Sequence, residues 1–186
     1  MVGDWKVNID VNGMPEKVAT AVGKLSEQIV GAEYTPIAYL GSQLVNGINH
    51  AVLAEQLLIT GKDTKNIVVL IFNEKGMDCS LVNIERVLTG GEGMGATTID
   101  VKTDIPQEAK EAYDNTMLGY VGFSIKLFAL LATQITHGTD YYFAASVEPM
   151  TLEGKPTVAI IKINDMLKSV EFIDILNKTL WSLKTY

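Results

Sequence analysis

The segment YTPIAYLGSQLVNGINHAVLAEQ (residues 34–56) carries the strongest structural signal in this chain of 186 residues. Two runs rich in apolar residues, 34–45 and 48–60, flank the pair Asn46-Gly47. An Asn-Gly pair between such runs indicates a β-hairpin, because both residues accept the positive φ angles of a tight turn. The segment therefore predicts two long antiparallel strands joined at Asn46-Gly47.

The same pattern recurs later in the chain, displaced by 91 residues (134 − 43 for the glutamine before each turn). Without a gap, 15–73 aligns with 106–164, and the eleven identities exceed the roughly three or four that common composition would give. The identities are Pro15/Pro106, Ala21/Ala112, Val30/Val121, Gly31/Gly122, Ala38/Ala129, Leu40/Leu131, Gln43/Gln134, Gly47/Gly138, Ala54/Ala145, Thr60/Thr151 and Asn73/Asn164. A repeat of this length suits two complete domains. We predict repeat 1 over 1–88, a Gly-rich linker over 89–97 and repeat 2 over 98–186.

Each copy is predicted to open with a helix and to add strands after its hairpin. The first helix is expected over 14–30, where apolar residues recur at helical spacing: Val18, Val22, Leu25 and Ile29. The second is expected between Pro106 and Gly122. The third strands are expected at 66–72 and 157–163, and the fourth at 79–86 and 169–176. The last of these segments has mixed periodicity, so a helix remains an alternative there.

Composition and charge exclude several classes of protein. The net charge of −7 disfavours a nucleic-acid partner, because phosphate binding needs a basic surface. The single cysteine, Cys79, cannot form an internal disulfide, so the fold does not depend on an oxidising compartment. The N-terminal residues 1–10 lack the pattern of a signal peptide, and the apolar stretch 67–72 is far too short to span a membrane. We therefore expect a cytoplasmic protein with neither a membrane nor a nucleic-acid partner.

Few residues are candidates for catalysis. His50 and His137 are the only histidines and belong to different copies, while Cys79 lies at the start of an expected strand. A Cys-His catalytic pair would require these side chains to converge. No close spacing of histidine, cysteine and carboxylate residues suggests a metal site. We therefore expect no enzymatic activity, no catalytic residue, no cofactor and no metal.

Both predicted hairpins resemble the first hairpin of cystatins and stefins, which inhibit papain-like cysteine proteases and carry the pattern Q-x-V-x-G there. The first copy matches this pattern at Gln43, Val45 and Gly47. The second copy reads QITHG (134–138), with threonine in place of valine, and continues in TDYY. The order of helix, hairpin and further strands also resembles this family. The resemblance implies the fold class α+β: two tandem cystatin-like domains, each with one helix packed on an antiparallel sheet.

The resemblance also implies a wedge that enters a protease cleft, made of a glycine near the N-terminus, the first turn and a second turn at 73–78. In repeat 1 the implied contact residues are Gly3, Gln43, Leu44, Val45, Asn46 and Gly47. The corresponding, weaker set in repeat 2 is Gln134, Ile135, Thr136, His137 and Gly138. The linker would tether that copy and His137 would add bulk to its turn. The implied function is reversible inhibition of a papain-like cysteine protease through repeat 1.

Two other interpretations stay open. Gln43 and Gly47 could serve the turn alone, since glycine fits a positive φ and glutamine can hydrogen-bond the hairpin. The chain would then be a binding or scaffold module without inhibitory activity. A third interpretation, a small-ligand binder or enzyme with a cavity under the helix, has no supporting cluster of residues. The first two interpretations differ in whether Gly3, 43–47 and 73–78 lie together at one exposed edge.

Overall fold

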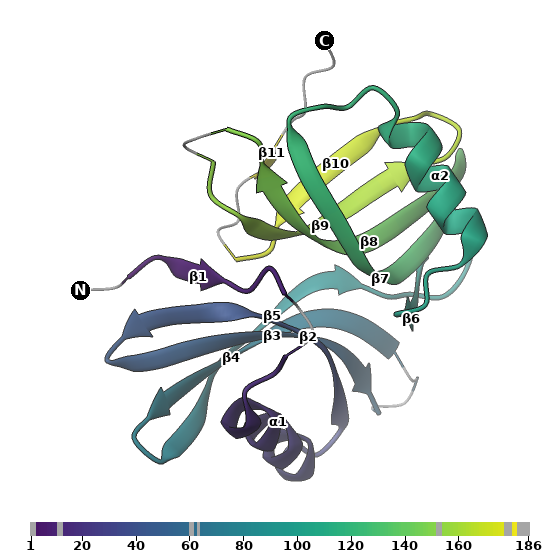
Figure 1. The fold of residues 1–186 in the computed structure, drawn as a ribbon. Helices are drawn as coiled ribbons and strands as arrows, with labels where there is room; N and C mark the ends of the chain where they lie inside the picture. Colours follow the sequence, from purple (N-terminus) through teal and green to yellow (C-terminus); the bar gives the residue numbers. More distant parts are fainter. Residues whose placement is uncertain are drawn as a thin grey trace. The chain divides into compact units, whose positions relative to one another are not determined.

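The computed structural model describes residues 3–10, 13–59, 62, 64–151, 154–176 and 180–181. The chain forms two compact units, Met1–Gly90 and Gly91–Tyr186 (Figure 1). The division between them falls inside the segment expected as the linker, 89–97.

Unit 1 contains a five-stranded sheet with the strand order β1-β2-β3-β4-β5. All neighbouring strands are antiparallel, and β2 to β5 follow one another as hairpins. The elements in chain order are β1 (Trp5–Val7), α1 (Glu16–Gln28), β2 (Ala32–Val45), β3 (Gly47–Leu58), β4 (Thr64–Lys75) and β5 (Asp78–Thr89).

Unit 2 repeats this arrangement in a sheet with the order β11-β10-β9-β8-β7-β6. A helix again separates the first strand from the second. The elements are β6 (Thr97–Lys102), α2 (Gln107–Met117), β7 (Phe123–Thr136), β8 (Gly138–Pro149), β9 (Thr157–Asn164), β10 (Val170–Asp174) and β11 (Leu180–Trp181).

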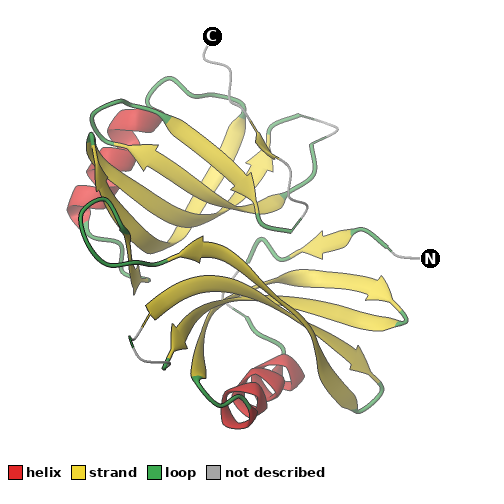
Figure 2. Cartoon of the chain, turned by 180° about the vertical axis from the view of Figure 1, so that it is seen from behind, coloured by secondary structure: helices red, strands yellow, loops and turns green. Residues whose placement is uncertain are grey.

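The predicted fold class, two α+β cystatin-like domains, is wrong. Strand makes up 56% of the structure and helix 14%, and the described residues form two antiparallel sheets and two short helices (Figure 2). Strand length is the physical reason. A strand of 14 residues such as β2 extends about 46 Å. A helix of 13 residues such as α1 extends about 20 Å and covers only part of one face. Moreover, 51–54 and 67–70 are buried without alternation, as in strands enclosed on both faces.

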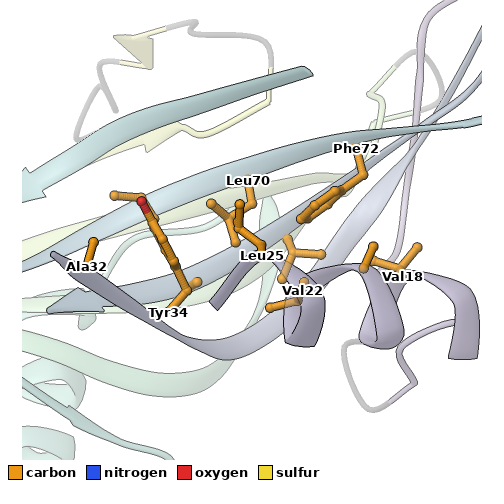
Figure 3. Close-up of a cluster of buried hydrophobic side chains, with 11 residues drawn as sticks. Val18, Val22, Leu25, Ala32, Tyr34, Leu70 and Phe72 are labelled. Atoms are coloured by element: carbon orange, nitrogen blue, oxygen red, sulfur yellow. The ribbon is translucent and has the colours of Figure 1, made fainter. Parts of the chain in front are cut away.

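The two helices nevertheless lie where their apolar spacing placed them. The helix α1 buries Val18, Val22 and Leu25, and these side chains face residues of the sheet such as Leu70 and Phe72 (Figure 3). The row of apolar side chains on α1 is shorter than expected. The helix ends at Gln28, and the backbone of Ile29 has an extended conformation. The helix α2 buries Ala109, Ala112 and Thr116.

The 91-residue repeat extends to irregularities of the backbone. Both first hairpins turn at a glycine with positive φ, Gly47 at 106° and Gly138 at 97°. Shifts of register recur at matching places in the two hairpins: Pro36/Ala38 with Leu127/Ala129, and Tyr39/Gly41 with Leu130/Ala132. The predicted equivalence of Gln43 and Gln134 is confirmed, because each glutamine lies four residues before its glycine on the first strand of a hairpin.

Other expectations about strands are settled by the structure. The segment 169–176 contains the strand β10, so the helical alternative there is wrong. The segment 79–86 lies within β5, and the third strands expected at 66–72 and 157–163 lie in β4 and β9. The strand β1 was missed, because three residues are too few to show a periodic pattern.

We expect the core of unit 2 to depend strongly on Phe143, which is fully buried and packs edge-on against the ring of Tyr113 at 5.7 Å. Replacing Phe143→Ala should lower the free energy of unfolding by about 3–5 kcal/mol in urea denaturation followed by circular dichroism. The control Ile135→Ala removes a side chain that is 67% exposed and should cost less than about 0.5 kcal/mol. Similar losses for both variants would contradict this assignment of the core.

Candidate functional site

Three separate segments of unit 1 meet at one end of its sheet. Gly3 donates its N–H to the carbonyl of Leu44 at 2.9 Å, beside the β2–β3 turn. The β4–β5 turn lies at the same end, because Glu74 is paired with Ile48 across β3 and β4. In both ribbon views this end carries the two hairpin turns and the N-terminal strand (Figures 1 and 2). We call Gly3, 43–47 and 73–78 the unit 1 tip.

A row of side-chain amides ties these segments together. Gln43 donates through Nε2 to the carbonyl of Gly3 at 3.0 Å, and its Oε1 accepts from Asn49 Nδ2 at 3.3 Å. Asn49 in turn accepts from Asn73 Nδ2 at 2.9 Å. An amide can both donate and accept, so each member of the row binds the next. This amide ladder crosses β2, β3 and β4 and fixes the backbone of Gly3.

Gly47 brings the two turns of the tip into direct contact. Its φ is +106°, a conformation that other residues rarely adopt. A Cβ atom at this position would lie 2.5 Å from the carbonyl oxygen of Glu74 and 2.9 Å from Asn73 Oδ1. Glycine at position 47 is therefore required by the conformation of the β2–β3 turn and by the close approach of the β4–β5 turn. This supports the interpretation in which Gly47 serves the turn itself.

A second polar cluster anchors the β4–β5 turn. The carboxylate of Glu74 accepts from Lys17 Nζ on α1 and lies 3.0 Å from His50 Nε2. A carboxylate can only accept, so this nitrogen of His50 carries a hydrogen, and Nδ1 of the same ring is hydrogen-bonded to Tyr39 Oη at 2.8 Å. We call Tyr39, His50, Glu74 and Lys17 the Glu74 cluster. The hydrogen bonds from Lys17 and then from His50 hold the pKa of Glu74 below its usual range.

Apolar side chains project from this polar frame. Leu44 is 69% exposed and Met77 is 97% exposed, one from each turn, and Asn46 is exposed between β2 and β3. Val45 and Gln43 are half-buried, so they act within the frame more than on its surface. The tip therefore presents two exposed apolar side chains on a hydrogen-bonded support, and binding to another protein would remove them from water.

Unit 2 has a tip of related construction, formed by Gly95, 134–138 and 164–169. Gln134 Nε2 donates to the carbonyl of Gly95 at 2.8 Å, as Gln43 does to Gly3. The other members differ, because Gln134 accepts from Tyr142 Oη and Asn164 donates to Asp140 at 2.6 Å. Of the site residues expected here, Ile135, Thr136 and His137 are exposed. The structure thus brings the expected residues of each copy together around one turn.

Cys79 lies on β5, directly after the β4–β5 turn, and is paired with Glu74 on β4. It lines a cavity of about 290 Å³ between α1 and the β4–β5 turn, together with Lys17, Lys24 and Met77. Burial, and then the charge of Glu74, raise the pKa of the Cys79 thiol, which makes it a poorer nucleophile at neutral pH. The cavity is next to the helix, near the place that the third interpretation required.

Neither a metal site nor a membrane span is found in the described part of the chain. No three histidine, cysteine or carboxylate side chains gather there in a way that could hold a metal ion. Within the same residues, no helix is both long and apolar enough to cross a bilayer.

Comparison with known proteins gives no further guide. No protein-family model matches the chain, and no curated protein matches it.

We expect Gly47→Ala to destabilise unit 1 by more than about 2 kcal/mol, because it combines backbone strain with a clash against the carbonyl of Glu74. The matched control is Gly76→Ala, which has a positive φ of 63° and open space around its Cβ. That variant should cost about 1 kcal/mol, the effect of the backbone alone. Thermal unfolding of both variants measures the difference, and equal losses would show that the two turns are not in contact.

Proposed function

We propose that the unit 1 tip binds a protein by entering a cleft, and that this cleft is the active site of a papain-like cysteine protease, which it blocks reversibly. The observation that carries the proposal is the convergence of Gly3, 43–47 and 73–78 at one end of the sheet, joined by the amide ladder. The sequence of the first turn, with Gln43, Val45 and Gly47, adds the resemblance to cystatins and stefins.

The frame of the tip supports tight binding. Gly3, Gln43 and Asn73 are held by hydrogen bonds before any partner arrives, so little conformational entropy remains to be lost on binding. The exposed side chains of Leu44 and Met77 supply apolar surface that a cleft can remove from water. Few protein side chains need to rearrange in such a complex.

The proposed inhibition involves no covalent step. The backbone at Gly47 has a positive φ and turns sharply, so the hairpin offers the protease no extended peptide bond for attack. Binding is expected to be competitive, and the chain should be recovered uncleaved. Cys79, whose thiol has a raised pKa, takes no part in it. Because the free thiol needs no oxidising environment, we place this activity in the cytoplasm.

A non-inhibitory binding module is the second candidate. It is favoured by unit 2, which repeats the bond between a glutamine and the glycine before its first strand while carrying Thr136 and His137 in its turn. Such a tip could be kept for a partner other than a protease. If the wild-type chain does not inhibit the protease but binds another protein through a tip, this second candidate would be favoured.

The proposal is tested by titrating papain with the intact chain and measuring hydrolysis of a small fluorogenic substrate. We expect competitive inhibition, with about 90% inhibition at about 10 μM if the complex has a dissociation constant of about 1 μM. Leu44→Asp should weaken inhibition at least about tenfold, because it brings a charge into the apolar contact.

The matched control for this test is Val30→Asp, which places the same charge at a fully exposed valine outside the tip. It should inhibit like the wild-type chain. No inhibition by the wild-type chain at about 100 μM, a concentration that would detect even weak association, would rule out the protease proposal.

A further inference from the structure

The Glu74 cluster reaches from inside the sheet of unit 1 to the outermost turn of its tip. His50 is 6% exposed and belongs to β3, while Lys17 extends from α1. Besides its bond to Glu74, Lys17 Nζ donates to the carbonyl of Gly76 at 3.0 Å. Gly76 directly precedes Met77, the most exposed apolar residue of the unit 1 tip. The position of Met77 is therefore coupled to the bonds that Glu74 makes.

Glu74 is the central group of the cluster, because both of its neighbours donate to it. Lys17 and His50 bind its two different oxygens, Oε1 and Oε2. If the carboxylate lost its charge, neither donor would keep a charged acceptor, and Lys17 would be free to leave Gly76. The amide ladder holds Asn73, and pairing of β4 with β5 extends to Lys75 and Asp78, so the bond from Lys17 to the carbonyl of Gly76 reaches the two residues beyond that pairing, Gly76 and Met77.

The described residues at the matching positions of unit 2 do not form an equivalent cluster. The residues 91 positions after Tyr39, His50, Glu74 and Lys17 are Leu130, Tyr141, Asp165 and Glu108. Here the two carboxylates face Tyr141, whose pKa is raised by burial and then by the charges of Glu108 and Asp165. Asp165 accepts instead from the backbone N–H of Thr139 at 2.8 Å. The second turn of unit 2 is thus held by hydrogen bonds to backbone N–H groups, and its Asp165 and the Glu108 of α2 are both carboxylates, which cannot form an ion pair with each other.

We propose that Glu74 is a positioning residue for the unit 1 tip: its carboxylate, through Lys17, holds the β4–β5 turn where Met77 can contact the partner. This inference rests on the proposed function for its effect on binding. The order of the turn itself can be measured on the free chain, so the two proposals can fail separately.

The positioning is expected to depend on pH. The groups that face Glu74 are Lys17 from α1, His50 from β3, Tyr39 behind His50, and Cys79, which is paired with Glu74 on β5. The bonds from Lys17 and His50 lower the pKa of Glu74 in the folded chain, so its stabilising contribution is present at neutral pH. The contribution should be lost as pH falls through the folded pKa, below the ordinary glutamate value of about 4.3.

The test compares the wild-type chain with Glu74→Gln, which keeps an acceptor of similar shape and removes the charge. Backbone ¹⁵N relaxation of Gly76 and Met77 is measured at pH 7 and during acidification. In the wild type we expect order parameters typical of a rigid backbone, about 0.85, that fall below about 0.6 under acid conditions. In Glu74→Gln they should be low at both pH values. The matched control Glu27→Gln removes an exposed carboxylate from α1 and should behave like the wild type.

Affinity for thiol-blocked papain is the second measurement on the same proteins. Glu74→Gln should bind about tenfold more weakly at pH 7, and its affinity should not change over the pH range in which the wild type weakens. A turn that stays equally rigid in Glu74→Gln would overturn the positioning role. If the wild-type turn depends on Glu74 and papain is not bound, the positioning role stands and the proposed function fails.

Discussion

The amide ladder is the interaction on which the unit 1 tip depends. The amides of the ladder are half-buried, so leaving one without a partner would cost part of the roughly 1–3 kcal/mol that applies to a fully buried amide. Gln43, Asn49 and Asn73 are hydrogen-bonded in a row across three strands, and Gln43 Nε2 also holds the backbone of Gly3. Hydrogen bonds therefore hold the three segments of the tip together. Gly47, which has no Cβ, allows the β2–β3 and β4–β5 turns to approach closely.

The two units show how one frame can carry different surfaces. Both retain the bond from a glutamine to a glycine carbonyl ahead of the first strand. At the position of Asn49, unit 2 has Asp140. Its carboxylate forms an ion pair with Lys162, whose Nζ lies 3.3 Å from Oδ2. In unit 1 the ion pair lies further out, between Lys17 and Glu74, where it controls the second turn. The hydrogen bond from the glutamine to the glycine carbonyl is common to both tips and joins the same segments in each. The ion pairs differ between the units, and with them the contacts that hold the outer turn.

Sequence patterns predicted the repeat, both first hairpins and both helices, because these depend on local spacing and on glycine at a turn. They failed on fold class, since spacing within α1 does not reveal how little of a long sheet the helix covers. The ladder and the Glu74 cluster were also missed. Asn49 and Asn73 become neighbours only through the register of β3 and β4, and His50 meets Glu74 across 24 residues of chain. The one available signal was that Gln43 and Asn73 recur in both copies.

The most direct measurement of the ladder is a double-mutant cycle between Gln43→Ala and Asn73→Ala in unit 1. Gln43 and Asn73 are each hydrogen-bonded to Asn49, which lies between them in the ladder. If the ladder acts as one unit, their effects on the free energy of unfolding should be non-additive by more than about 0.5 kcal/mol. Additivity within about 0.3 kcal/mol would contradict a connected ladder and with it the account of how the tip is assembled.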